Sequence, residues 1–282
     1  MNGIAIKIVV DSTCALSRED QERLDVLVVP QVVHFGDETY LDGVDLTNEQ
    51  FYDKLDQCER PPTTSQVSPE VFRDAFQGCL DAGDDVVGIT LSSDLSGTYN
   101  SVRLAQESIG SDRLHIVDSR TVAMSLALLV SEAAKHRDAG CSAWEVVDHV
   151  KMLAKKVRFL AVVNMLKYLR KGGRISAASH VVGEALGMKP ILSVVNGTAQ
   201  AIGKARGMQA ALKTIMQDVL ANLPDLRYGV AFAHACAPEL LEKAIACLKE
   251  PLKLTHWLVC PIGSGVGSYA GRGAIGFAYI AK

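Results

Sequence analysis

The feature that most constrains this chain is an alternation, through residues 4–155, of short apolar runs with stretches that carry helix signals. The runs end in polar turns, as expected of strands buried on both faces of a parallel sheet. They are residues 4–10, 26–33, 85–91 and 114–117. Pro30 indicates an edge or a break within the second of them. The alternation predicts a mainly parallel sheet with helices on both faces.

Capping signals mark several of the helices. Thr47 is followed three residues later by Gln50, and Ser142 by Glu145, which is the pattern of a capping box. Helices are therefore expected to begin at these two places. Two more are expected over residues 97–109 and 122–137, directly after the third and fourth apolar runs.

The second half of the chain has a different pattern. Asn196-Gly197 predicts a hairpin between strands at residues 190–195 and 199–202. Helices are expected over residues 208–221 and 238–248, and further strands over residues 159–163, 228–233, 254–259 and 274–280. This predicts an α+β domain with a mixed or antiparallel sheet. We therefore expect two domains, residues 1–156 and 157–282, with a ligand site between them.

Composition excludes several classes of function. The formal net charge of the 282 residues is -3, so a broad basic surface for nucleic acid is not expected. The seven cysteines contain no Cys-x-x-Cys pair and the histidines are scattered, which argues against a metal site. We expect no cofactor.

The sequence gives no sign of a membrane segment. The N-terminal residues lack a basic leader, and Lys7 and Asp11 interrupt their apolar stretch, unlike a signal peptide. The most apolar helix candidate, residues 122–130, is far shorter than the ~20 residues of a membrane span. We expect a cytoplasmic protein without an integral membrane segment.

A first polar loop, residues 61–69, contains Thr64 and Ser65. Ser68 and Pro69 predict a helix start directly after it. The two hydroxyls can therefore face an anion. An ordinary proline turn with solvated hydroxyls explains the same residues, and by residue types alone it is the preferred interpretation.

A second polar loop, residues 92–99, follows a strand and begins a helix, where free backbone N–H groups favour an anion. It carries Ser93, Ser96, Gly97 and Thr98, and the glycine permits close approach of a ligand. The alternative is a serine cap with a packing glycine. The number of hydroxyls favours the anion site.

A third loop is basic. Arg170 and Arg174 flank two glycines, and Arg206 adds charge further along the chain. Arginine binds carboxylate or phosphate in forked geometry. A solvated basic turn is an equally good interpretation.

A serine hydrolase is the enzymatic alternative. It requires a general base beside a serine such as Ser93 or Ser12, and His234 is a candidate. The chain has no Gly-x-Ser-x-Gly elbow and no phosphate-binding P-loop. A buried structural histidine is therefore the better interpretation of His234, and no catalytic residues are expected.

These segments together resemble the DegV family over nearly the whole chain. The resemblance rests on the order and spacing of residues 8–13 (IVVDST), 40–45 (YLDGVD), 64–69 (TSQVSP), 92–99 (SSDLSGTY), 117–119 (VDS), 169–176 (LRKGGRIS) and 189–192 (KPIL). It implies a two-domain fold that binds a long-chain fatty acid between the domains.

The resemblance also implies a site and a role. The carboxylate is expected at Thr64 and Ser93, with Ser96 and Gly97 beside them. Members that partner a bacterial fatty acid kinase present the bound acid for phosphorylation to acyl-phosphate, and the kinase supplies ATP and magnesium. Arg170, Arg174 and Arg206 are then candidates for contacting the partner or its phosphate.

The chain departs from the family near its C-terminus. The family usually has Gly-Thr-His-x-Gly-Pro-Gly where residues 267–273 have GSYAGRG, so that Tyr269 replaces the histidine and Arg272 the proline. Asn164 stands where an aspartate is usual. Tyrosine can donate a hydrogen bond but does not titrate near neutral pH. A lipid-responsive sensor without kinase coupling is therefore kept as an alternative.

A bound acyl tail requires small or aliphatic residues. The candidates are Ala161, Val163, Leu192, Val194, Ala233 and Ala235, for which ordinary core packing is the default interpretation.

Overall fold

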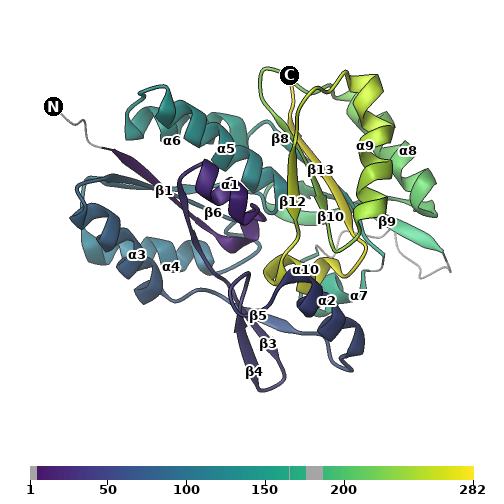
Figure 1. Cartoon of the computed structure of the whole chain (residues 1–282), viewed down its shortest axis with the longest axis horizontal. Helices are drawn as coiled ribbons and strands as arrows, with labels where there is room; N and C mark the ends of the chain where they lie inside the picture. Colours follow the sequence, from purple (N-terminus) through teal and green to yellow (C-terminus); the bar gives the residue numbers. More distant parts are fainter. Residues whose placement is uncertain (1–4, 165, 176–186) are drawn as a thin grey trace.

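The computed structural model describes residues 5–164, 166–175 and 187–282, and its first half is built on a parallel sheet (Figure 1). The strand order is β2-β1-β6-β7 and every neighbouring pair is parallel. The strands are β1 (Ile6–Asp11), β2 (Val26–Val29), β6 (Asp85–Thr90) and β7 (Leu114–Asp118). The parallel sheet predicted from the alternation is confirmed.

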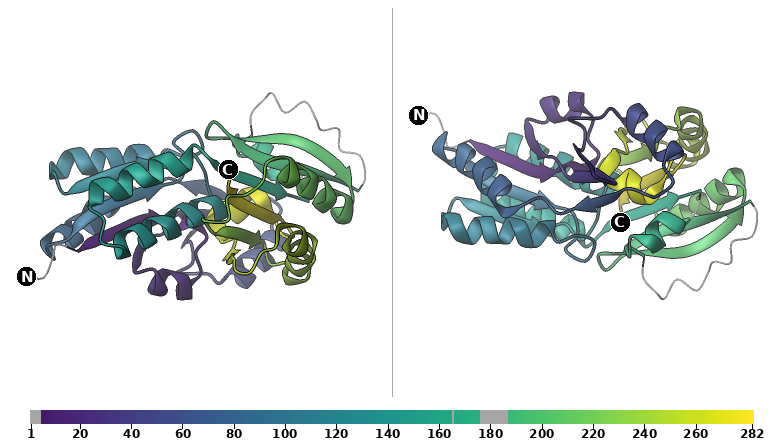
Figure 2. Two further views of the ribbon diagram at one scale, coloured as in Figure 1. Left: turned by 90° about the horizontal axis from the view of Figure 1, so that it is seen from above. Right: turned by 90° about the horizontal axis from the view of Figure 1, so that it is seen from below.

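Helices cover both faces of this sheet (Figure 2). On one face, Phe72 and Phe76 of α3 pack with Val9, Val86 and the α4 residue Val102. The helices of this half are α1 (Arg18–Arg23), α3 (Pro69–Asp81), α4 (Thr98–Ile109), α5 (Met124–Asp138) and α6 (Ala143–Ala154), with a short 3-10 turn, η1 (Ser12–Cys14). The capping box predicted at Ser142 and Glu145 is present at the start of α6.

Helix α5 joins the two halves of the molecule. All its residues from Met124 to Ala134 are buried, so it has no solvent-facing stripe along that stretch. It packs on β1 of the parallel sheet and on β11 and β13 of the second sheet. A helix that is buried all round belongs between two layers. The start of α5 is therefore fixed between the parallel sheet and the second sheet.

The second half holds a six-stranded mixed sheet, with order β10-β9-β8-β13-β11-β12. Only β11 and β12 pair in parallel among its strands. The strands are β8 (Val157–Val162), β9 (Met188–Val195), β10 (Thr198–Arg206), β11 (Val230–His234), β12 (Leu258–Pro261) and β13 (Ile275–Ile280), with α8 (Met208–Ala221) and α9 (Pro238–Leu252) on one face (Figure 1). Asn196 and Gly197 form the predicted β9–β10 turn, both with positive φ.

Residues 26–33 form two strands where one was expected. The chain leaves the parallel sheet at Pro30-Gln31, and β3 (Val32–Phe35) then joins a separate antiparallel sheet of order β4-β3-β5. This sheet also contains β4 (Glu38–Leu41) and β5 (Thr63–Ser65). Helix α2 (Asn48–Gln57) lies between these two strands in the chain and begins at the predicted Thr47 capping box. Pro30 marked a break between sheets, and β5 carries Thr64 and Ser65.

The second half of the chain differs from the sequence prediction in the bounds of α9 and β12 and in two additional short helices. Helix α9 continues through Pro251 to Leu252, and the next strand is β12 at Leu258–Pro261 instead of residues 254–259. Two short helices, α7 (Lys167–Lys171) and α10 (Ser264–Ala270), occupy stretches for which no helix was predicted. The two glycines within α10 hide its helical pattern. Among the described residues, no helix combines the length and apolar character that a membrane span needs.

Candidate functional site

A cavity lies where the loops of the parallel sheet meet the inner face of the six-stranded sheet. It contains about 900 Å³ of space outside the atoms, including its open mouth. Its walls are mostly aliphatic. Four of the six predicted tail residues, Ala161, Val163, Leu192 and Val194, line it. Ala233 and Ala235 do not, and they are fully buried in the core.

The polar groups of the cavity include Thr64 and Tyr269. Thr64 lies on β5 and Tyr269 on α10, and their hydroxyl oxygens are 2.6 Å apart. A Cβ on Gly172 would come within 2.3 Å of the Tyr269 ring, so a side chain there would displace the ring. The guanidinium of Arg174 lies 5.2 Å from the ring centroid in a cation–π contact. The ring is therefore held from several sides with its hydroxyl at Thr64.

A buried hydrogen-bonded chain supplies further hydroxyls. Gln31 Nε2 donates to Thr98 Oγ1 at 3.0 Å, and Thr98 Oγ1 lies 3.0 Å from Ser96 Oγ. Gln31 and Ser96 line the cavity, whereas Thr98 is buried behind them. The Ser96 hydroxyl also accepts from the Thr98 N–H, so it helps to begin α4. Ser96 is the hydroxyl of this loop that lines the cavity.

Gly97 packs against a neighbouring loop, and its expected contact with a ligand stays a prediction. It is exposed and does not line the cavity. A Cβ added to it would come within 1.8 Å of the Gln66 side chain. The absence of a side chain therefore lets Gln66, from the loop after β5, lie against the start of α4.

Ser93 and Ser65 point away from the cavity lining. The Ser93 hydroxyl accepts from Arg120 Nη1 at 3.0 Å, and its N–H donates to Asp118. The Ser65 hydroxyl lies 3.0 Å from His34 Nε2. Because neighbouring residues of a strand face opposite sides, Ser65 turns away where Thr64 turns in. A role for either serine in holding a ligand stays a prediction.

The contact of Ser65 with His34 lies on the side of β5 opposite to Thr64, away from the cavity. His234, the base considered from the sequence, accepts the Ala237 N–H at Nδ1, and burial holds its pKa below the ordinary value. Both observations fit a neutral structural histidine. The described residues contain no group of three or more side chains that could hold a metal ion.

The three arginines lie in different settings. Arg174 lines the cavity and donates to the backbone carbonyls of Leu95 and Gly172. Arg170 is exposed near the end of α7, and Arg206 is exposed at the end of β10. Arg174 is thus placed to contact a ligand in the cavity, whereas Arg170 and Arg206 are exposed at the surface. Their expected contact with a partner stays a prediction.

Two buried carboxylates hold the polar loops in place. Asp11 accepts from the N–H groups of Thr13 and Leu91, both of which line the cavity, and from the Thr13 hydroxyl. Burial raises the pKa of Asp11, and these hydrogen bonds oppose that rise. Asp42 accepts from Ser264 N–H at 2.7 Å and Ser264 Oγ at 2.8 Å. It therefore fixes the start of α10, the helix that carries Tyr269.

Gln31 and Thr13 line the cavity, although neither was among the predicted site residues. Thr13 belongs to the polar turn after the first predicted strand, and that position was the signal that could have identified it. Gln31 carried no such signal, because it lies within a run that was interpreted as one continuous strand. Asn164 donates to the Arg272 carbonyl and accepts from Lys189, so it ties the C-terminal loop to β9.

Comparison with known proteins shows a consistent relationship. The model of a family described as uncharacterised proteins of the DegV type matches residues 5–282. A DegV domain-containing protein of Caldanaerobacter subterraneus is 33% identical over 273 residues, covering 96% of this chain and 97% of the relative. One from Deinococcus radiodurans is 34% identical over 278 residues, covering 98% of both.

Solved structures agree in fold. A fatty acid-binding DegV family protein from Thermus thermophilus has a TM-score of 0.88 at 28% identity, covering 99% of this chain and 100% of that one. A stearic acid-binding protein from Eubacterium ventriosum has a TM-score of 0.88 at 27% identity, covering 98% of both. The arrangement of the sheets is therefore shared by these chains.

Proposed function

The chain belongs to the DegV family, and on this premise we propose that it binds one long-chain fatty acid in the cavity and presents the carboxylate to a partner fatty acid kinase. The observation that carries the proposal is an aliphatic cavity with the hydroxyls of Thr64 and Tyr269 at its wall. The anionic head of a fatty acid requires hydrogen-bond donors such as these hydroxyls, and its long apolar tail requires an aliphatic cavity.

The energetics favour such a ligand. Each methylene buried in the aliphatic region contributes about 0.8 kcal/mol, so a long tail stabilises the complex strongly. A carboxylate placed in the same cavity needs hydrogen-bond donors, since an unpaired buried charge is costly. Tyr269, Thr64 and Ser96 can donate without bringing a fully buried cation. Arg174 adds a positive charge at the cavity wall.

Relatives support the choice of ligand. The proteins from Thermus thermophilus and Eubacterium ventriosum are described as binding fatty acid and stearic acid. Both share the fold of this chain at a TM-score of 0.88. We extend this ligand class to the present chain because its own cavity is aliphatic.

Binding is tested on the purified full-length chain. Native mass spectrometry compares the protein with and without added palmitate, and calorimetry measures the dissociation constant. We expect one acyl ligand per chain. Absence of any bound acid, together with no heat of binding for palmitate or oleate, contradicts the proposal.

Kinase coupling needs a separate experiment. The palmitate complex is mixed with a bacterial fatty acid kinase, ATP and magnesium, and acyl-phosphate formation is measured. Arg206→Glu should slow this transfer and leave the dissociation constant of palmitate unchanged, because Arg206 is exposed and outside the cavity. Arg103→Glu, which alters an exposed arginine on α4, is the control.

Tight palmitate binding without any acyl-phosphate would reject the kinase role alone. The chain would then fit a lipid-responsive sensor, the alternative that Tyr269 keeps open. A protein captured only by the loaded chain would distinguish that role.

A further inference from the structure

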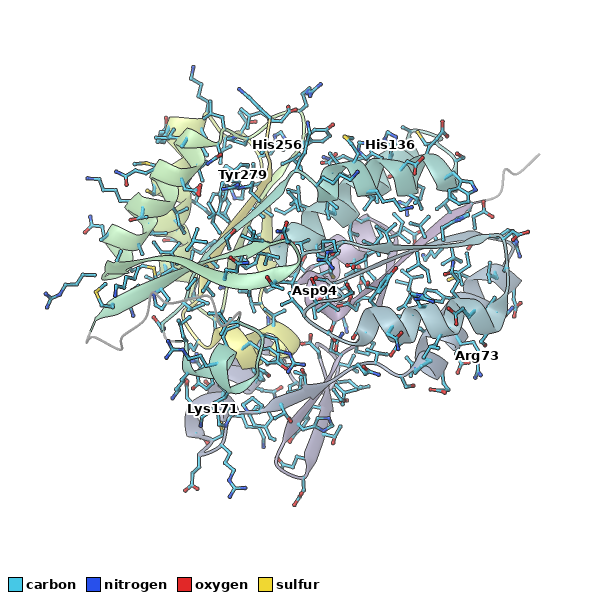
Figure 3. The ribbon with its side chains drawn as sticks, turned by 180° about the vertical axis from the view of Figure 1, so that it is seen from behind. Arg73, Asp94, His136, Lys171, His256 and Tyr279 are labelled. Carbon is cyan, nitrogen blue, oxygen red and sulfur yellow. The ribbon has the colours of Figure 1, made fainter. Side chains whose placement is uncertain are left out.

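The guanidinium of Arg120 joins the tip of the β9–β10 hairpin to the polar loop of residues 92–97. Arg120 Nη2 donates to the Asn196 carbonyl at 2.6 Å and to Asp94 Oδ2 at 2.5 Å. Its Nη1 donates to Ser93 Oγ at 3.0 Å. One guanidinium therefore joins the loop after β6 to the tip of a hairpin in the other sheet. Figure 3 shows Asp94 at the junction between the two halves.

A second contact lies beside it. The buried Ser92 hydroxyl donates to the Gly197 carbonyl at 2.7 Å. A Cβ on Gly197 would come within 2.7 Å of both the Arg120 guanidinium and the Ser92 hydroxyl. The hairpin tip therefore fits against Ser92 and Arg120 with no room for a side chain. Gly197 also has a φ of 83°, which disfavours other residues.

The backbone around Arg120 is arranged to hold this geometry. Arg120 has a φ of 56°, a left-handed conformation that is uncommon outside glycine. The Asp118 carboxylate accepts from the N–H of Arg120 at 3.0 Å and from that of Ser93 at 3.2 Å. These bonds aim the guanidinium and the Ser93 loop at each other. The arrangement is built from the loops that follow both β6 and β7.

Both sides of this contact continue directly into the cavity wall. Val194 and Ala199 flank the hairpin turn, while Leu95 and Ser96 follow Ser93 and Asp94, and all four line the cavity. If the hairpin tip moved away from the loop, two walls of the same cavity would separate. The Arg120 side chain is 41% exposed, and exposed ion pairs are weak, so the contact can open without unfolding of either half.

We propose that Arg120 is a positioning residue that closes the cavity over a bound acyl chain by holding the β9–β10 hairpin against residues 92–97. The contact also leaves the Ser93 proton available, because the Ser93 oxygen accepts from Arg120. Loss of the contact frees the hairpin and speeds ligand release. The proposal rests on the proposed function only for its ligand.

The test uses the full-length chain as wild type, Arg120→Met and Gly197→Ala. Arg103→Met is the control, since Arg103 pairs with Glu107 on the exposed side of α4. Hydrogen exchange measures opening of residues 194–199 without ligand. Stopped-flow displacement of cis-parinaric acid by palmitate measures the dissociation rate.

We expect Arg120→Met to speed exchange of the hairpin and to raise the dissociation rate about tenfold, while the control changes neither. Gly197→Ala attacks the same contact from the other side and should act alike, which keeps the test valid if one variant does not fold. Unchanged exchange overturns the proposal. Faster exchange with an unchanged dissociation rate also overturns it. If wild type binds no fatty acid, the proposed function fails, and the exchange comparison still decides whether Arg120 holds the hairpin.

Discussion

The hydroxyl of Tyr269 lies 2.6 Å from that of Thr64, although 205 residues separate the two in the chain. One comes from the small antiparallel sheet and the other from the short helix before β13. In the free protein the two hydroxyls bond to each other. A bound carboxylate can accept from both, and thus replaces a contact between neutral groups with charge-assisted ones.

Thr64→Val should weaken palmitate binding because it keeps the side-chain shape and removes one donor. An unsatisfied head group costs about 1–3 kcal/mol, which corresponds to a roughly 5- to 150-fold higher dissociation constant. Thr63→Val is the matched control, since Thr63 is exposed and is absent from the cavity wall. Calorimetry of both variants makes the comparison. Equal affinities for the two would remove Thr64 from the head-group site.

Tyr269→Phe tests the other donor. The ring should stay in place between Gly172 and Arg174, so only the hydroxyl is lost. We expect a dissociation constant for palmitate that rises by about tenfold, with little change in thermal stability. Tyr228→Phe, at a half-buried tyrosine that does not line the cavity, should bind as wild type does. A wild-type affinity in Tyr269→Phe speaks against a carboxylate at this position.

Val194→Trp should block the tail region. Val194 lines the cavity, and each methylene excluded from it loses about 0.8 kcal/mol, so palmitate should bind at least ~10-fold more weakly. Val195→Trp is an adjacent control whose side chain is exposed on the other face of β9. Octanoate binding measured alongside shows whether a shorter tail escapes the block. Equal palmitate binding in both tryptophan variants would contradict this placement of the tail.

Stability should fall as the pH is lowered from about 7.5 to about 5.5, across the ordinary histidine pKa of about 6.5. His149 stacks on His136 with ring centroids 4.0 Å apart, and burial, assisted by His136, holds the pKa of His149 below its ordinary value. The unfolded chain therefore takes up a proton before the folded chain does, which favours unfolding. Burial lowers the pKa of His115 and His234 in the same direction.

Urea unfolding of His149→Asn isolates this effect. The variant should lose less stability than wild type over the same pH interval, because one depressed histidine is gone. His256→Asn serves as the control, since its side chain is exposed on a loop. An identical pH dependence in wild type and His149→Asn would show that the stacked pair does not contribute.

Local signals predicted the parallel sheet, the capped helices and the β9–β10 turn. The two capping boxes and the Asn196-Gly197 turn depend on contacts between residues a few positions apart, so they can be predicted from the local sequence alone. The small antiparallel sheet of β3, β4 and β5 was not predictable in this way. Whether residues 26–33 continue one sheet or divide between two depends on what packs around Pro30, which no local pattern records.

The site was predictable only in outline. Residue types singled out residues 92–99, but for residues 61–69 they favoured an ordinary proline turn. The choice of inward-facing hydroxyl depends on backbone torsion angles. Ser96 turns inward and Ser93 turns to Arg120 within the same loop. The contact between Asp42 and Ser264 spans 222 residues, and a single sequence carries no information on such a pairing.

A crystal structure of the chain with palmitate shows whether the cavity holds the acid. We predict continuous density for one acyl chain along Ala161, Val163 and Leu192, with the carboxylate within hydrogen-bond distance of Thr64 and Tyr269. Side chains filling that space, or a carboxylate held elsewhere while Thr64 and Tyr269 remain bonded to each other, would contradict it.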